Sequence, residues 1–270
     1  MIKYALVITI IVICSFSWVA ESHSITIAPA RFEARLPAGE VAGIDYYAQN
    51  DTDEPIHVTV EPVNWLQNVY DYSGIAAGDW IKAEPCEFDL KPKEIKKVHV
   101  TVRVPKKAKG ELVAQIFFTS AILGISDDAG GSIKSRLGAV LYVAIKGTEK
   151  VNAEIGDISI SGLKIDEKDG IKIDVLLRNK GNVHIRPAKG RVVVSDVNGR
   201  EISQLNLVTD YSVVPGQEFA YTVSWDNPVL KEEKYKISAF IKYGRMYTKE
   251  KTAEFEKWFE ADKLGKVISK

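Results

Sequence analysis

The chain has 270 residues, with 36 lysines and arginines against 36 aspartates and glutamates, so its formal net charge is zero. A neutral chain lacks the basic excess with which proteins hold nucleic acid, and no nucleic-acid partner is expected. The two cysteines, Cys14 and Cys86, are too few for a disulfide framework. Folded domains must therefore be stabilised by burial of apolar side chains, for which about 100 to 120 residues per domain suffice.

The first 22 residues have the pattern of an export signal. Lys3 supplies a positive charge, Tyr4–Val19 is apolar apart from small polar residues, and Ala20 and Ser22 precede a cut that would leave His23 first. The apolar run is also close to the length of a helix that spans a bilayer, so retention as an N-terminal anchor is the alternative. We expect the protein to work in the periplasm or elsewhere in the extracytoplasmic cell envelope.

Alternation of apolar and polar residues predicts a first β-rich domain over residues 23–148. Its opening strands, Ser24–Ala28 and Arg31–Leu36, are separated by Pro29. Proline cannot donate a ladder hydrogen bond, so the chain there lies at a sheet edge or switches sheets. The later strands are predicted at Val41–Gln49, Ile56–Glu61, Val98–Val104, Leu112–Ala121 and Leu137–Ile145.

A second β-rich domain is predicted over residues 152–247, with few contacts to the first across residues 147–153. Turns recur about every 8 to 12 residues without helical periodicity, which favours sandwiches over α/β layers. The fold class predicted is therefore all-β, with two immunoglobulin-like β-sandwiches in tandem. Residues 248–270 are predicted to be an amphipathic tail, because Phe255, Trp258 and Phe259 would share one side of a short C-terminal helix.

The two domains repeat one local pattern, in which an asparagine turn links two strands and a proline-led hairpin precedes a strongly alternating strand. In the first domain the turn begins at Asn50 and the hairpin contains Pro92; in the second they are Asn179 and Pro215. The similar offsets indicate that the same fold is used twice.

The sequence offers little for catalysis or metal binding, and no enzyme activity, cofactor or metal is expected. It has no Gly-x-Ser-x-Gly motif, and the Ser161 to Lys164 spacing falls where a strand would turn. Cys86 is predicted to be a half-buried, unreactive thiol. Three histidines stand singly on expected strands and would face solvent by alternation: His57, His99 and His184.

Two surface features could bind a ligand. A basic hairpin could meet an anionic wall polymer or lipid headgroups, and an aromatic loop could bind a carbohydrate or a partner protein. The basic hairpin carries Lys96, Lys97, Lys106 and Lys107, although lysines also protect an exposed sheet edge. The aromatic loop carries Trp65 and Trp80, for which burial beneath the domain is the alternative.

The first domain resembles the N-terminal domain of periplasmic pilus (fimbrial) chaperones. The resemblance is carried by Ile25–Phe32 with its proline and arginine, the Asn50 turn, Ile81–Pro85 before Phe88–Pro92, and the late strands 112–121 and 137–146. The second domain resembles the immunoglobulin-like domain that follows in such proteins.

The resemblance implies that two sandwiches meet at an angle and that the cleft binds an incomplete partner subunit. Two basic residues would hold the partner's terminal carboxylate, at positions matched by Arg31 and, with a less certain register, Arg136. Ile133 and Leu137 would be apolar residues that complete the partner's sheet by β-augmentation. The preceding run Gly124–Ser132 departs from the family pattern, since it offers only Ile125 as a large apolar residue.

The sequence thus predicts a non-enzymatic, exported factor that binds another exported protein, pilin-like or wall-associated, and assists assembly or presentation of a surface protein. The alternative is a cell-surface or wall-associated binding module that contacts the envelope through the lysines or tryptophans named above.

Overall fold

In a computed structural model of the chain, the residues described are 25–64, 75–122, 134–165, 168–209, 211–244, 248–263 and 265–268. The predicted export signal, Trp65 and Ile133 lie outside them. The elements of the first part are β1 Ile25–Ala28, β2 Arg31–Leu36, β3 Val41–Asn50, β4 Ile56–Asn64, α1 Ala77–Trp80, β5 Ile81–Glu84, β6 Glu87–Leu90, β7 Ile95–Arg103, β8 Glu111–Ile122 and β9 Lys134–Ile145. Those of the second part are β10 Ala153–Ile165, β11 Lys168–Asn179, β12 Arg186–Ser195, β13 Glu201–Leu207, β14 Glu218–Asp226, β15 Lys234–Gly244, β16 Lys251–Ala261 and β17 Val267–Ile268.

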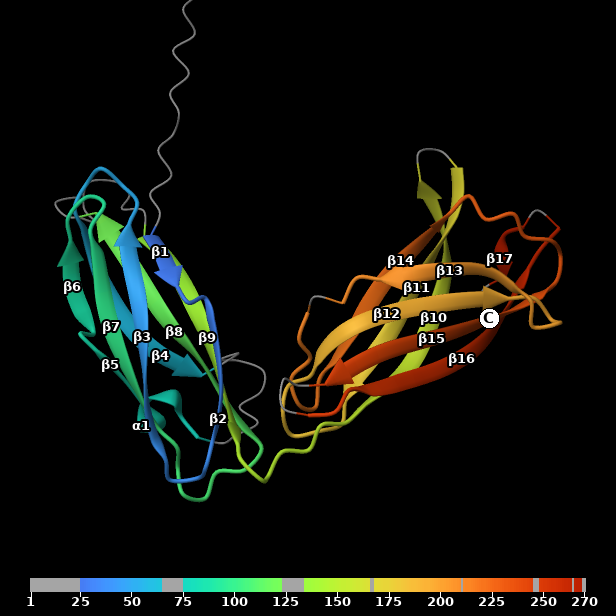
Figure 1. The fold of residues 1–270 in the computed structure, drawn as a ribbon. Helices are drawn as coiled ribbons and strands as arrows, with labels where there is room; N and C mark the ends of the chain where they lie inside the picture. Colours follow the sequence, from blue (N-terminus) through green and yellow to red (C-terminus); the bar gives the residue numbers. More distant parts are fainter. Residues whose placement is uncertain are drawn as a thin grey trace, which may run out of the picture.

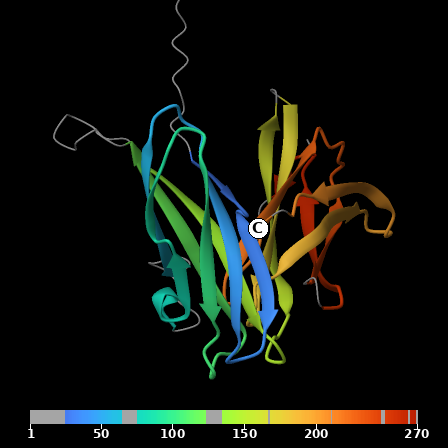
Figure 2. The same cartoon turned by 60° about the vertical axis from the view of Figure 1, so that its left-hand side comes forward.

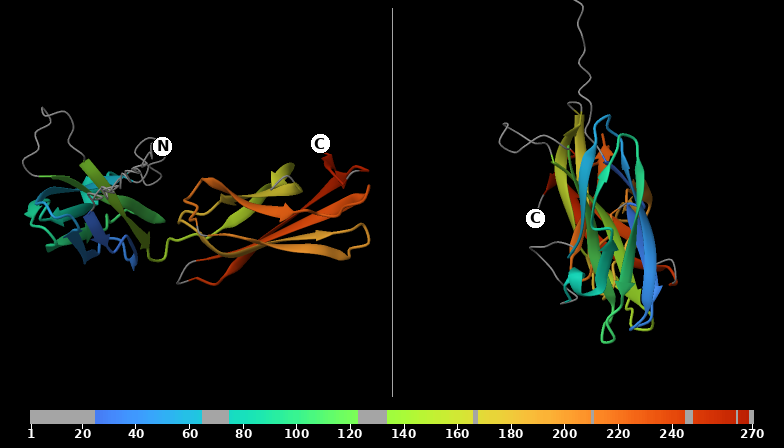
Figure 3. Two further views of the ribbon diagram at one scale, coloured as in Figure 1. Left: turned by 90° about the horizontal axis from the view of Figure 1, so that it is seen from above. Right: turned by 90° about the vertical axis from the view of Figure 1, so that its left-hand side faces the viewer.

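These strands form two sandwiches, which confirms the predicted fold class (Figure 1). The first packs a four-stranded sheet, ordered β1-β3-β7-β5, on a five-stranded sheet, ordered β2-β9-β8-β4-β6. The second packs a three-stranded sheet, β10-β11-β14, on a five-stranded sheet, β13-β12-β15-β16-β17. Seen from above, the two sandwiches lie one after the other, joined by the segment between β9 and β10 (Figure 3). Within the described ranges, no helix is long and apolar enough to cross a membrane.

Alternation explains which face of each strand is buried. On β7, Val98, Val100 and Val102 are fully buried while Lys97 and His99 face solvent. β8 is buried along most of its length because it lies in the middle of its sheet, as its continuous apolar run predicts. Each sandwich has its own apolar core as a result.

Pro29 marks a switch between sheets, as predicted. β1 pairs with β3 in the four-stranded sheet, whereas β2 pairs in parallel with β9 in the five-stranded sheet. This crossover brings Arg31, the first residue of β2, opposite Val140 in the middle of β9.

The predicted C-terminal helix is wrong. Lys251–Ala261 forms β16, which pairs with β15 along its length. Ala253, Phe259 and Ala261 face the core while Trp258 is 53% exposed, so the burial has a period of two. The spacing of Phe255, Trp258 and Phe259 imitates a helical face, and the solvent-facing tryptophan conceals the alternation.

Candidate partner-binding site and domain joint

The five-stranded sheet of the first sandwich has an uncovered stretch of edge. β9 pairs with β8 from Lys134 to Ala144, but β2 pairs with β9 only from Val140 onward. Among the described residues, no strand pairs with residues 134–139 on that side. We call residues 134–139 of β9 the free edge. Such an edge presents backbone N–H and C=O groups that another strand can pair with.

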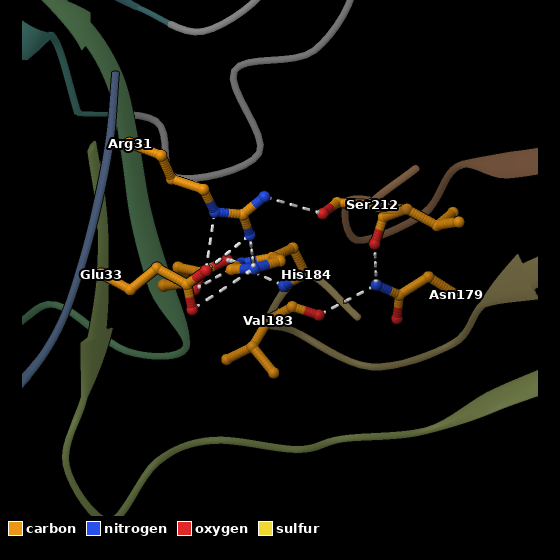
Figure 4. Close-up of polar contacts among 8 residues, drawn as sticks. Arg31, Glu33, Asn179, Val183, His184 and Ser212 are labelled. Atoms are coloured by element: carbon orange, nitrogen blue, oxygen red, sulfur yellow. Dashed lines mark hydrogen bonds and ion pairs between the residues drawn. The ribbon is translucent and has the colours of Figure 1, made fainter. Parts of the chain in front are cut away.

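Arg31 stands at the end of the free edge, where β2 begins. Its Nε donates to Glu33 Oε1 at 2.7 Å, its Nη1 donates to Ser212 Oγ at 3.2 Å, and its Nη2 lies 2.9 Å from His184 Nε2 (Figure 4). The guanidinium also lies 4.7 Å from the centre of the Tyr142 ring. The Arg31 side chain nevertheless remains 31% exposed. It therefore connects the two sandwiches and is still accessible to a ligand.

A buried acid–histidine pair lies behind Arg31. His184 Nδ1 is 2.8 Å from Glu111 Oε2, and the backbone N–H of His184 donates to the same oxygen at 2.8 Å. The His184 and Glu111 side chains are 1% and 0% exposed, and the Tyr142 ring lies against the imidazole at a tilt of 37°, with centroids 3.9 Å apart. A buried carboxylate is tolerated only with such hydrogen-bond partners. Glu111 and His184 come from different sandwiches. The buried carboxylate of the first sandwich therefore obtains its hydrogen bonds from the buried histidine of the second.

We call this set of contacts the joint; it comprises Arg31, Glu33, Glu111 and Tyr142 of the first sandwich and His184 and Ser212 of the second. The two sandwiches overlap in the view of Figure 2, and Figure 1 shows that they are close where β9 leads into β10 and diverge from there. Ala144 of β9 is fully buried and packs in the apolar core of the second sandwich. A small set of contacts between residues distant in sequence therefore connects the two sandwiches, and the domain boundary at residues 147–153 stays a prediction.

Two further contacts fix the angle beside the joint. Gly110 has a φ of +72°, and a Cβ placed there would lie 2.6 Å from the backbone oxygen of Asn182. Only glycine allows the strand turn of the first sandwich to approach the second so closely. Glu149 pairs with Arg35; burial acts against its ionisation, but bonds from Arg35 and from backbone N–H groups hold the pKa of its carboxyl below the usual value.

The structure places Arg136 away from Arg31. Arg136 lies four residues before Val140, so the two backbones are separated by about 13 Å along the strand. Its guanidinium lies 3.9 Å from the centre of the Phe117 ring, and its Nη2 is 3.5 Å from Glu61 Oε2. Arg31 and Arg136 thus contact different carboxylates within the chain, and Arg136 does not lie beside Arg31.

Leu137 lies on the free edge and is 40% exposed. It follows the parity of Ala139 and Leu141, whose side chains point into the first sandwich, while Arg136 points to the outer face. The free edge therefore has one apolar and one basic side, and partner binding by Leu137 stays a prediction. Ile133 lies outside the described residues.

The tryptophan and lysines predicted as surface-binding residues differ in their exposure and contacts. Trp80 is 2% exposed and belongs to the core of the first sandwich, so its prediction as a surface-binding residue is wrong. Lys96 lies 5.4 Å from the centre of the Phe88 ring, and Lys97 pairs with Asp45 at 3.3 Å. Lys106 and Lys107 are exposed on the loop after β7. A hydrogen bond from His99, aided by Lys97, lowers the pKa of the Asp45 carboxyl, so this face carries paired charges.

Two single-residue predictions are also corrected. Cys86 is exposed rather than half-buried. His184 is fully buried rather than solvent-facing, because it lies just before β12 in a segment that contacts the first sandwich, where strand alternation does not apply. His57 and His99 face solvent as predicted and bond to Asp89 and Asp45. The sequence analysis did not identify Glu111 or His184 as residues of the joint. The one local signal is Glu111 itself, a charged residue at the start of the otherwise apolar strand β8.

No family model matches the chain, and no curated protein is similar to it. Among solved structures, a class 5 fimbriae chaperone, CfaA, is 14% identical, with 87% of this chain and 99% of that chain covered and a TM-score of 0.48. A Salmonella enterica SafA pilin–SafB chaperone complex contains a chain 11% identical, with coverage of 87% and 97% and a TM-score of 0.45. The Acinetobacter baumannii CsuC–CsuE chaperone–tip subunit complex gives 13% identity, coverage of 86% and 97%, and a TM-score of 0.42. Each of these neighbours is a chaperone of fimbriae or pili, or a complex that contains one.

Proposed function

We propose that the protein is an exported, non-enzymatic binding factor that holds an extended segment of another exported protein, in the manner of a pilus chaperone. The observation that carries the proposal is the free edge of β9 with Arg31 at its end. Strand addition to such an edge gains affinity from main-chain hydrogen bonds and specificity from alternate side chains.

The geometry also favours one direction for the added strand. A segment that pairs with residues 134–139 would occupy the line that β2 continues from Arg31 onward. If that segment runs parallel to β9, as β2 does, its C-terminal end lies beside Arg31. Because a guanidinium is a fork of N–H donors suited to carboxylates, Arg31 favours a segment that ends there in a free C-terminal carboxylate.

The sides of the free edge define the side chains that such a segment should carry. Residues on the inner side would pack with Leu137 and should be apolar. Residues on the outer side would lie near Arg136, whose contact with Glu61 is long at 3.5 Å, and polar or acidic side chains suit that position. The partner is thus an alternating, C-terminal strand of a pilin-like or wall-associated subunit. The proposed place of action is the periplasm or another part of the cell envelope.

A synthetic C-terminal strand tests the proposal. The probe is an acetylated ten-residue peptide that alternates valine and threonine, prepared with a free C-terminal carboxylate and as the C-terminal amide. The free acid should bind the protein without its first 22 residues about tenfold more tightly than the amide, since a charge-assisted hydrogen bond contributes about 1.5–3 kcal/mol. Arg31→Ala should abolish that difference.

Arg103→Ala is the matched control, because Arg103 is an exposed arginine at the end of β7 in the other sheet of the same sandwich. It should preserve the preference for the free acid. Equal binding of acid and amide by the unmodified protein would contradict the role of Arg31. Leu137→Asp should weaken both peptides, and an unchanged affinity would contradict the use of the free edge.

A further inference from the structure

The buried His184 lies between an acid and a cation, and its two ring nitrogens have different tasks. Arg31 Nη2 lies 2.9 Å from Nε2, while Glu111 lies 2.8–2.9 Å from Nδ1 through both of its carboxylate oxygens. A guanidinium can only donate hydrogen bonds, so Nε2 must be the acceptor and carry no proton. A carboxylate accepts, so the ring proton must be on Nδ1. The contacts therefore fix one neutral tautomer, with the order Glu111, His184, Arg31.

We propose that His184 is a positioning residue for Arg31. Glu111 fixes the orientation of the neutral imidazole, and the imidazole in turn holds the Arg31 guanidinium at the end of the free edge. The ligand of Arg31 is taken from the proposed function, whereas the contact between His184 and Arg31 involves only residues of this chain. Glu33 Oε1 contacts both Nε and Nη2 of the same guanidinium, and Ser212 contacts Nη1. Tyr142 packs against both the imidazole and the guanidinium. Together they set the direction of the fork.

The same geometry makes the hold depend on protonation. A proton on Nε2 would face the N–H of Arg31, so that hydrogen bond would be lost. The protonated nitrogen would instead attract Glu33, whose Oε2 lies 3.8 Å away, and Glu33 is the carboxylate that now binds Arg31. The charged groups around the ring are thus Arg31 and Glu33 on β2 and Glu111 on β8, while Arg186 and Glu250 line the groove beside it. Protonation would remove two of the contacts that orient Arg31.

The first test needs no partner. In the protein without its first 22 residues, ¹⁵N NMR at pH 7.5 should show His184 Nδ1 protonated and Nε2 bare, with slowed rotation of the Arg31 guanidinium. When the pH is lowered until the ring takes up its second proton, the guanidinium should rotate freely. The opposite tautomer or a doubly protonated ring at pH 7.5 would overturn the inference. So would an Arg31 guanidinium that rotates equally fast in the unmodified protein and in His184→Ala.

The second test uses the free-acid peptide, which carries no group that titrates between pH 5 and 8. Its affinity for the unmodified protein should fall about tenfold between pH 7.5 and the pH at which NMR shows the ring doubly protonated, on the scale of one hydrogen bond to a charged group. His184→Gln should retain the affinity and lose the pH dependence, because an amide can donate to Glu111 and accept from Arg31 without titrating. His184→Ala should bind weakly at both pH values, and thermal melts should establish that both variants are folded.

A His184→Gln variant with the same pH dependence as the unmodified protein would overturn the inference. If the peptide does not bind the unmodified protein at either pH, the proposed function fails, and the NMR measurement alone decides whether His184 positions Arg31.

Discussion

The asparagine turns of the two sandwiches perform the same task but face different surroundings. Asn50 ends β3, and its buried side chain donates to the carbonyls of Glu54 and Lys91 while accepting from the N–H of Thr52. Asn179 ends β11 and donates to the carbonyls of Val183 and Val213 while accepting from the N–H of Gly181. In each sandwich the amide ties a turn to the hairpin that leads into the partner strand.

The two turns differ in the surface that each one reaches. After Asn50 the turn faces solvent, with Asp53 in an exposed ion pair with Lys93. After Asn179 the turn reaches the first sandwich, where Asn182 approaches Gly110 and His184 bonds to Glu111. The Asn50 turn therefore stabilises only its own sandwich. The Asn179 turn stabilises its sandwich and also positions residues of the joint.

The largest effects are expected when each asparagine is replaced by alanine. Asn50→Ala and Asn179→Ala each remove at least three hydrogen bonds between the side-chain amide and backbone groups, so each should lower the free energy of unfolding of its sandwich by about 2–4 kcal/mol. Urea denaturation checks both. Asn179→Ala should also release the Arg31 guanidinium, whereas Asn50→Ala should leave its rotation slow. Equal effects of the two variants on Arg31 would refute the distinction between the turns.

Effects of intermediate size are expected when Gly110 and Gly147 are each replaced by alanine. Gly110 and Gly147 both have positive φ, at +72° and +87°, but a Cβ at Gly147 would meet nothing within 4 Å. Alanine at Gly147 should cost about 1 kcal/mol of backbone strain alone. Alanine at Gly110 carries that strain and also collides with Asn182, so it should widen the angle at the joint. Small-angle scattering and denaturation separate the two, and an unchanged scattering profile for Gly110→Ala would argue against a fixed joint.

The smallest expected effects come from one buried tyrosine in each sandwich. The hydroxyl of Tyr46 is buried with no hydrogen-bond partner among the described residues, whereas that of Tyr221 donates to the carbonyl of Tyr211 at 2.7 Å. Tyr46→Phe should therefore stabilise the protein by about 1 kcal/mol and Tyr221→Phe should destabilise it by a similar amount. Two changes of the same sign in thermal melts would contradict the contrast.

Alkaline pH provides a second measurement on Tyr46. Burial raises the pKa of Tyr46 to about 12, from an ordinary value of 10.0. The folded state therefore keeps the proton where the unfolded chain loses it, so this contribution is fully present below pH 10 and is lost as pH rises toward 12. Tyr46→Phe should lack that part of the alkaline loss of stability.

Sequence patterns predict the features that depend on local chemistry. Alternation identifies β7, the continuous apolar run identifies β8, and Pro29 marks the change of sheet. β16 is missed because Trp258 faces solvent and the pairing with β15 overrides a helix-like spacing. The joint could not be predicted, because Glu111 and His184 are separated by 73 residues and acquire their roles only through burial against each other. Arg31 could be proposed as a site residue, but its contacts with Glu33, His184 and Ser212 depend on tertiary structure.

The most direct test of strand addition at the free edge is amide hydrogen exchange of β9 with and without the free-acid peptide. We expect amides within residues 134–139 to become protected on binding, while β8 and β16 do not change. The C-terminal amide peptide should give weaker protection at the same concentration. Protection that appears elsewhere, or that is the same for acid and amide, would contradict strand addition at the free edge with Arg31 at its end.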